Sequence, residues 1–367
     1  MKDGDNGWVS SDGPPVFVVG ASRSGTALLR SALNKHRDVF LAGETHYFDD
    51  LRPTLRHRGL APIEDEERAR CEDYFLSLAH RPFGHGGVAA QSRLDRQELR
   101  QLAERLGGGG DGYFQAYCNL ARQLEPQAAA SPLRWGEKTP RHVFRLGEIL
   151  QRYPGAQAIC MYRDPRAVVA SYRDWRHQGG FDLENDVDHA MALESEHRRT
   201  SQSYDPSIVS LLWRTTVKAG HQARARFGPD RVLLQRYEDI ASDPEASFRL
   251  IAGWLGMEFE PAMLDVPHHN SSYNQFQGNA GVSTAPVERW KSTLDPQEIA
   301  VVQGWCRRDM ARMGYDAYLV SLAPVATVLL LLKLPFRLLR AAAANAGRMG
   351  SIPRYVWRRV SLLLSSS

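Results

Sequence analysis

The segment GASRSGT at residues 20–26 constrains this chain most, because of what stands on each side of it. An apolar run at 16–19 precedes it, and a helical pattern follows it, with Leu29 and Leu33 on the same face. This order predicts a strand, a phosphate-binding loop and a helix. The backbone N–H groups of such a loop and the helix N-terminus together form an anion site.

The loop resembles a Walker A motif but lacks its lysine. It ends in Gly25-Thr26 with no Lys before Thr26, and Arg23 is its only cation. The Walker A Lys reaches the β- and γ-phosphates, and the hydroxyl that follows it holds Mg²⁺. The loop therefore predicts binding of a diphosphate-like group without a triphosphate–metal clamp. Taken alone, it is also compatible with an ordinary Gly/Ser turn.

Apolar runs elsewhere predict the rest of a sheet. Strands are expected at 39–42, 156–162 and 232–237, and helices at 186–202 and 208–226. Short strands that alternate with helices indicate an α/β fold with a P-loop-like parallel sheet flanked by helices. In such sheets ligands bind at the carboxyl ends of the strands.

The segment 50–132 differs from this pattern and is predicted to be a helical insertion that meets the acceptor. Amphipathic stretches at 94–106 and 113–124 predict two of its helices, with a glycine-rich break at 107–112. The expected division of the chain is a flexible N-terminus (1–14), one large domain (15–316) and an apolar and basic helical tail (317–367).

Charge and cysteine content exclude some classes of function. The formal net charge is +4, and seven cations with no Asp or Glu lie after Asp316, so the body before the tail carries 4 − 7 = −3. That balance argues against a nucleic-acid-binding domain. The four cysteines are far apart and lack zinc spacing, which favours reduced thiols and no metal site. The polar N-terminus has no signal-peptide core, so a cytoplasmic location is expected.

The tail introduces a membrane hypothesis. Residues 317–332 carry no charge, but a spanning helix needs about 20 apolar residues. The seven cations suit peripheral contact with an anionic membrane surface. A helix packed on the body and a single membrane span are the alternatives.

A second anion motif follows the predicted strand at 156–162. Arg163-Asp-Pro-Arg stands at the strand end, and Ser171 follows on the next helix. An Arg and a Ser so placed could converge on a second phosphate. The alternative is a salt-bridged helix start.

Together the two motifs resemble those of sulfotransferases that use 3′-phosphoadenosine 5′-phosphosulfate (PAPS), over roughly residues 15–315. The pattern is most similar to the tyrosylprotein sulfotransferase-like (bacterial sulfotransferase) branch, through RSGTAL at 23–28 and Gly-Glu-Thr at 43–45. The resemblance implies PAPS as cosubstrate, no metal, and a hydroxyl acceptor in a glycan, a glycolipid or a peptide tyrosine.

The resemblance also implies roles for individual residues. Glu44 matches the general base. Charge on the transferring group would be stabilised by Arg23, Lys138 and Ser283. The nucleotide would be bound by Arg23, Ser24, Gly25, Thr26, Ala27, Arg163, Ser171, Tyr237, Arg289 and Lys291.

The chain departs from the branch at two positions. Ala27 replaces a second loop Thr and so loses a hydroxyl. Trp175 stands where an Arg is expected after the helix Ser, and Arg173 or Arg176 is a candidate substitute.

His46 is a rival base two residues after Glu44. If 44–46 is extended, the two side chains point to opposite faces, so only one can face the site. The family spacing favours Glu44.

Two other functions compete with a sulfotransferase. One is an atypical P-loop kinase or ATPase, and the other is a non-catalytic nucleotide-binding protein. The missing Gly-Lys-Ser/Thr argues against the first. The presence of both anion motifs together with Glu44 and Lys138 argues against the second.

Overall fold

The computed structural model describes most of the chain. The described residues are 13–78, 94–123, 134–178, 194, 198–266, 281–321, 328, 331–346 and 351–364. The expected flexible N-terminus therefore falls almost wholly outside them. The division of the chain at 15, 50, 132 and 317 stays a prediction.

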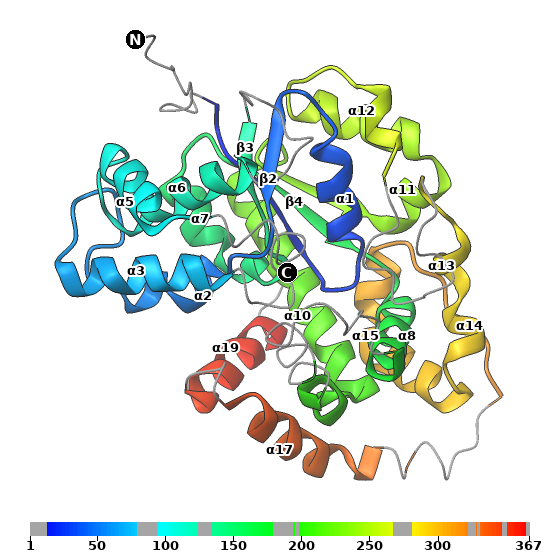
Figure 1. The fold of residues 1–367 in the computed structure, drawn as a ribbon. Helices are drawn as coiled ribbons and strands as arrows, with labels where there is room; N and C mark the ends of the chain where they lie inside the picture. Colours follow the sequence, from blue (N-terminus) through cyan, green and yellow to red (C-terminus); the bar gives the residue numbers. More distant parts are fainter. Residues whose placement is uncertain are drawn as a thin grey trace.

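A five-stranded sheet lies at the centre of the described chain (Figure 1). Its strands are β1 (Val16–Gly20), β2 (Val39–Ala42), β3 (Arg134–Lys138), β4 (Gln157–Tyr162) and β5 (Val232–Arg236). They are ordered β2-β3-β1-β4-β5, and every neighbouring pair is parallel. All five carboxyl ends therefore lie at one edge of the sheet.

Helices surround this sheet. The α-helices are α1 (Thr26–Leu33), α2 (Tyr47–Asp50), α3 (Asp65–Ser77), α5 (Arg96–Arg105), α6 (Gly110–Gln123), α7 (Leu146–Arg152), α8 (Pro165–Gln178), α10 (Pro206–Phe227), α11 (Tyr237–Ser242), α12 (Pro244–Trp254), α13 (Ala285–Glu288), α14 (Trp290–Thr293), α15 (Pro296–Arg312), α17 (Leu334–Ala344) and α19 (Ile352–Leu364). The 3₁₀ helices are η1 (Arg52–Thr54), η3 (Pro140–Arg145) and η4 (Pro261–Leu264).

The alternation of side chains along the strands creates two cores. In β1, Phe17 and Val19 face a cluster that includes residues of α6, α8, α10 and α15. Val16 and Val18 face the opposite cluster, with residues of α1, α11 and α12. Helices thus cover both faces of the parallel sheet, which confirms the expected α/β class.

The apolar runs predicted four of the five strands. The strand expected at 232–237 is one residue too long, because Tyr237 begins α11. Strand β3 was not predicted, since its sequence RWGEK contains one large apolar residue, Trp135. All five of its residues are nevertheless buried. Its charged side chains are paired: Arg134 with Gln157 and two backbone carbonyls, and Lys138 with Glu44.

The glycine-rich run at 107–112 does separate two helices, but the break is shorter than the run, since α5 ends at Arg105. Helix α6 begins inside it, at Gly110. A Cβ added to Gly110 would lie 2.5 Å from Leu55 Cδ1, so glycine here permits close packing. The helix expected at 94–106 agrees with α5. Leu124, the expected end of the next helix, lies outside the described residues.

The long helix expected at 208–226 agrees with α10, which starts slightly earlier. Asp205 caps it by accepting from the Ser207 and Ile208 N–H groups at 2.8 and 3.2 Å. Most of the helix expected at 186–202 lies outside the described residues. The part that is described, from 198 to 203, is helical.

The tail contains α17 and α19, which Figure 1 shows in brown and red in the lower part of the view. Among the described residues, no helix has the length and apolarity that crossing a membrane would require.

Candidate active site

Five of the predicted site segments lie at the carboxyl ends of strands, so the parallel sheet brings these five to one edge. The loop at 21–25 follows β1, Glu44 follows β2, and Arg163 follows β4. Lys138 is the last residue of β3, and Tyr237 is the first residue after β5. This edge is where parallel α/β sheets bind ligands.

The loop after β1 has the backbone of an anion-binding turn. Arg23 and Gly25 have positive φ angles of 68° and 84°. Left-handed residues alternating with their neighbours form an N–H-lined concavity, and α1 begins at Thr26 immediately after it. The hydroxyl of buried Ser24 donates to the carbonyls of Ala21 and Met161, which fixes the loop on β4.

The two predicted anion motifs form one cluster. Arg23 Nε donates to Ser171 Oγ at 3.0 Å. Arg163 Nη1 donates to the carbonyl of Arg23 at 3.3 Å. The Arg163 guanidinium lies 4.6 Å from the ring centre of Tyr237, and a Cβ on Gly25 would lie 2.5 Å from Tyr237 Cδ2. Tyr237 therefore packs on both the loop and the second motif.

Arg163 retains capacity to bind an anion. Its side chain is buried, and its Nε has no hydrogen-bond partner in the structure. Its Nη2 donates to the carbonyl of Pro286 at 2.5 Å. A buried guanidinium with an unused N–H favours a charged acceptor beside it.

Tyr172 contacts the loop after β1 and was not predicted. It follows Ser171 on α8, and its hydroxyl hydrogen-bonds with Ser22 of the loop. Burial raises the pKa of Tyr172, whereas the Ser22 hydrogen bond and the charge of Arg23 act to lower it and Glu44 acts to raise it. The sequence signal for Tyr172 was its position beside Ser171.

Glu44 and Lys138 form an ion pair at the adjacent strand ends. Lys138 Nζ lies 2.5 Å from Glu44 Oε1, and both side chains are largely buried. Burial alone would raise the pKa of Glu44. The charge of Lys138 and the hydrogen bond from His46 outweigh burial and lower this pKa to about 2.

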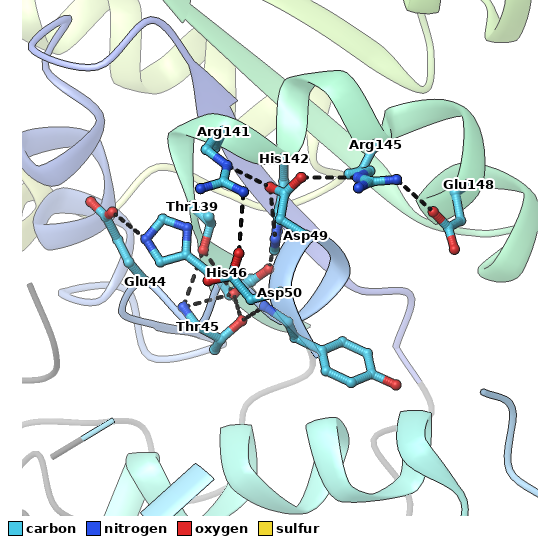
Figure 2. Close-up of polar contacts among 12 residues, drawn as sticks. Glu44, Thr45, His46, Asp49, Asp50, Thr139, Arg141, His142, Arg145 and Glu148 are labelled. Atoms are coloured by element: carbon cyan, nitrogen blue, oxygen red, sulfur yellow. Dashed lines mark hydrogen bonds and ion pairs between the residues drawn. The ribbon is translucent and has the colours of Figure 1, made fainter. Parts of the chain in front are cut away.

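Residues 44–46 do not have the extended backbone on which Glu44 and His46 would face opposite ways. His46 Nε2 lies 3.3 Å from Glu44 Oε2. Figure 2 shows the two side chains pointing toward each other. The physical reason is that His46 has a positive φ of 54°, so residues 44–46 are not extended. The Nδ1 atom of His46 is buried without a hydrogen-bond partner.

A buried polar network contacts Thr45, the residue between Glu44 and His46 (Figure 2). Glu137 Oε2 accepts from the Thr45 and Thr139 hydroxyls at 2.5 and 3.0 Å. Glu137 Oε1 lies 2.5 Å from His142 Nδ1. Burial opposes charge on both members of this pair, but their attraction lowers the pKa of Glu137 and raises that of His142.

The second layer of this network comes from α2 and η3. Asp49 lies 3.8 Å from His142 Nε2 and accepts from Arg145 at 2.9 Å. Arg141 pairs with Asp49 and Asp50, each at 3.2 Å. Charged groups of η3 thus hold α2, the helix that directly follows the Glu44 loop.

The segment after residue 281 reaches the anion cluster through its backbone. The carbonyl of Ser283 lies 3.4 Å from the Tyr237 hydroxyl, and the Ser283 hydroxyl accepts from the Ala285 N–H. Arg289 lies 3.8 Å from Asp174. Lys291 pairs with Glu288 at 2.5 Å. The structure therefore brings Ser283 close to Tyr237 of the anion cluster. The ion pairs described for Arg289 and Lys291 are with Asp174 and Glu288, not with residues of that cluster.

Trp175 stands where the family pattern has an Arg, and of the two candidate substitutes only Arg173 has a described side chain. Arg173 donates to Glu298 and to the carbonyl of Thr293 at 2.6 and 2.7 Å. The side chains of Trp175 and Arg176 lie outside the described part of the chain.

The arrangement combines an anion site with a carboxylate next to it. Among the described residues, no group of three or more His, Cys, Asp and Glu side chains could hold a metal ion. The four cysteines are buried and unbridged. Chemically, the edge can hold phosphate-like groups and can offer a carboxylate to accept a proton.

Comparison with known proteins agrees with this arrangement. The chain is 24% identical to the protein-tyrosine sulfotransferase of Drosophila melanogaster, over 83% of this chain and 52% of that protein. It thus spans about half the length of that relative. It is 23% identical to an omega-hydroxy-beta-dihydromenaquinone-9 sulfotransferase of Mycobacterium bovis, over 77% of this chain and 74% of that protein.

A solved structure and a family model complete the comparison. The sulfotransferase domain from the curacin biosynthetic pathway has a TM-score of 0.49 and 18% identity, over 83% of this chain and 99% of that chain. The model of the sulfotransferase family matches residues 14–261. The chain belongs to the sulfotransferase family.

Proposed function

We propose that this sulfotransferase transfers the sulfuryl group of PAPS to a hydroxyl group of an acceptor. The observation that carries the proposal is the continuous cluster of Arg23, Ser171 and Arg163, next to the Glu44–Lys138 pair. A nucleotide with phosphates at two positions needs two anion sites, and under this proposal the ends of β1 and β4 would supply them.

The residues of the cluster fit the two ends of such a nucleotide. The loop at 21–25 and the start of α1 would hold the 5′-phosphosulfate through backbone N–H groups and Arg23. Arg163 and Ser171 would hold the 3′-phosphate, to which the free Nε of Arg163 can donate. Tyr237 packs on both parts and would line the nucleotide site.

Glu44 would act as the general base. An S–O bond to the acceptor oxygen forms while the S–O bond to the 5′-phosphate breaks. The acceptor hydroxyl gives its proton to Glu44, leaving a sulfate ester and adenosine 3′,5′-bisphosphate. Arg23, Lys138 and Ser283 would stabilise the charge on the sulfuryl and leaving oxygens, each worth about 100- to 1,000-fold in rate.

Lys138 holds two roles in this proposal because it is already paired with Glu44. The low pKa of Glu44 makes it a weak base as long as Lys138 stays at 2.5 Å. If Lys138 turns toward a sulfuryl oxygen, Glu44 loses its largest favourable charge interaction and becomes more basic. Binding of the donor would thereby activate the base.

The acceptor would approach Glu44 from the side of α3. Tyr74 of α3 donates from its hydroxyl to the carbonyl of Thr45 at 2.6 Å, next to Glu44. This contact supports the assignment of 50–132 to acceptor binding. The named relatives act on a protein tyrosine and on an omega-hydroxy menaquinone derivative, so both a peptide hydroxyl and a lipid hydroxyl are candidates here.

Calorimetric titration tests the choice of nucleotide. We expect adenosine 3′,5′-bisphosphate to bind, and Arg163→Ala to weaken this binding by roughly 10- to 100-fold, since it loses charge-assisted hydrogen bonds of about 1.5–3 kcal/mol. Arg249→Ala is the matched control, because Arg249 is an exposed residue of α12 paired with Glu245. Tight ATP–Mg²⁺ binding without a preference for the bisphosphate would favour the P-loop kinase alternative.

A further inference from the structure

The tail helices α17 and α19 are each fixed to the body by one face. On α17, Arg337 pairs with Asp205 at 2.5 Å and Arg340 donates to the carbonyl of Gln202 at 2.9 Å. On α19, the carbonyl of Leu363 accepts from Lys218 at 2.7 Å. The Arg359 guanidinium lies 3.3 Å from the ring centre of Phe144 in η3.

The opposite faces of both helices are apolar and exposed. On α17, Phe336 is 69% exposed and Leu339 is 72% exposed. On α19, Trp357 is 70% exposed and Leu364 is 79% exposed. Ten of the fifteen exposed large apolar residues in the described chain lie between 328 and 364. Such a concentration marks an interaction surface.

Exposed cations accompany this apolar surface in the tail. Residues 317–367 contain seven Lys and Arg and no Asp or Glu. Arg337 and Arg359 turn inward, whereas Lys333, Arg354 and Arg358 are exposed. On α19, the spacing of Arg354 and Arg358 places them together on a side next to the apolar stripe.

We propose that the outer faces of α17 and α19 dock on an anionic lipid surface, with both helices lying in its plane. Apolar side chains beside cations on an exposed helix are the pattern of interfacial membrane binding. The excess of positive charge indicates a negatively charged partner, because anionic headgroups attract each basic residue near the lipid surface. A second copy of the same face would meet it with like charges, which disfavours a symmetric dimer through this surface.

The docked surface would lie next to the candidate active site. The inner face of α19 packs on Phe144 of η3, and η3 also contributes Arg141 and His142 to the network behind Glu44. The lipid surface is then about one helix diameter, some 10 Å, from that segment. This placement would favour an acceptor hydroxyl that is itself presented at a membrane.

Vesicle flotation of the full chain tests the proposal. We expect the protein to float with vesicles of phosphatidylcholine and phosphatidylglycerol and to bind much more weakly to phosphatidylcholine alone. Arg354→Gln with Arg358→Gln should reduce binding to the anionic vesicles by about fivefold per charge, and added salt should reduce wild-type binding in the same direction.

Substitutions of the apolar face separate lipid contact from general charge attraction. Leu339→Glu with Trp357→Glu should abolish flotation and leave bisphosphate binding and thermal stability unchanged, because both side chains are exposed. Leu250→Glu is the matched control, since Leu250 is 56% exposed on α12. The proposal fails if wild type does not bind anionic vesicles, or if Leu250→Glu weakens binding as much as the tail variant. It also fails if light scattering shows a dimer that the tail variant dissolves.

Discussion

Replacing Glu44 by Gln is expected to lower kcat by about 100- to 10,000-fold, the range that general bases contribute. Gln keeps the size of the side chain and can still accept from Lys138, but it cannot take a proton from the acceptor. The affinity for adenosine 3′,5′-bisphosphate should stay the same, because the anion cluster lies on other strand ends. The measurement is steady-state kinetics with PAPS and an acceptor, alongside calorimetry with the bisphosphate.

His46→Gln is the comparison that assigns the base. His46 lies 3.3 Å from Glu44, so either side chain could take the proton of the acceptor hydroxyl. If Glu44 is the base, His46→Gln retains far more activity than Glu44→Gln. The assignment is overturned if His46→Gln shows the large loss of kcat and Glu44→Gln does not.

The pH dependence of kcat/KM adds a second check on Glu44. Its pKa in the free protein is lowered to about 2, because Lys138 and His46 outweigh the effect of burial. A group with a lowered pKa is ionised at every pH well above that value, so Glu44 is a carboxylate in any ordinary buffer. We therefore expect no acid limb from Glu44 above about pH 3.

The parts of the fold that sequence could predict are those where burial follows hydrophobicity. Strands β1, β2, β4 and β5 are apolar runs, and their positions were predicted closely. Strand β3 is equally buried but contains Arg134, Glu137 and Lys138. Burial of these charges depends on partners far away in the sequence, so no local pattern could reveal this strand.

The candidate site also has a part that the sequence could predict and a part that it could not. Loop and strand-end motifs identified Arg23, Arg163 and Ser171, and the structure brings these three together. The contact between His46 and Glu44 depends on one left-handed residue, which the sequence pattern does not encode. The roles of the site residues remain predictions until the variants are measured.

Glu137→Gln is expected to destabilise the fold by about 3–5 kcal/mol, because removing one member of a buried ion pair leaves the other uncompensated. Glu137 and His142 are both fully buried and lie 2.5 Å apart. The amide of Gln also keeps only one acceptor oxygen, so it cannot accept both from the Thr45 and Thr139 hydroxyls and from His142. Chemical denaturation of wild type and variant, monitored by circular dichroism, measures the difference.

The destabilisation should depend on pH in a direction that the two pKa shifts determine. The pKa of Glu137 is lowered from 4.5, so its stabilisation is present above about pH 4.5 and is lost as the pH falls through the folded value. The pKa of His142 is raised from 6.5, so its stabilisation is present below about pH 6.5 and is lost as the pH rises through the folded value. The cost of Glu137→Gln should therefore be largest between about pH 4.5 and 6.5.

Glu245→Gln provides the matched control for this effect. Glu245 is a half-exposed residue that pairs with Arg249 on the surface of α12, and such pairs contribute about 0–1 kcal/mol. If Glu137→Gln costs no more than this control, His142 is not held as a cation by Glu137. The loop that carries Glu44 would then be positioned by its other contacts, such as the hydrogen bond from Tyr74 to the Thr45 carbonyl. A large cost that peaks in the stated pH range means instead that a buried ion pair fixes the strand end from which Glu44 and Lys138 act.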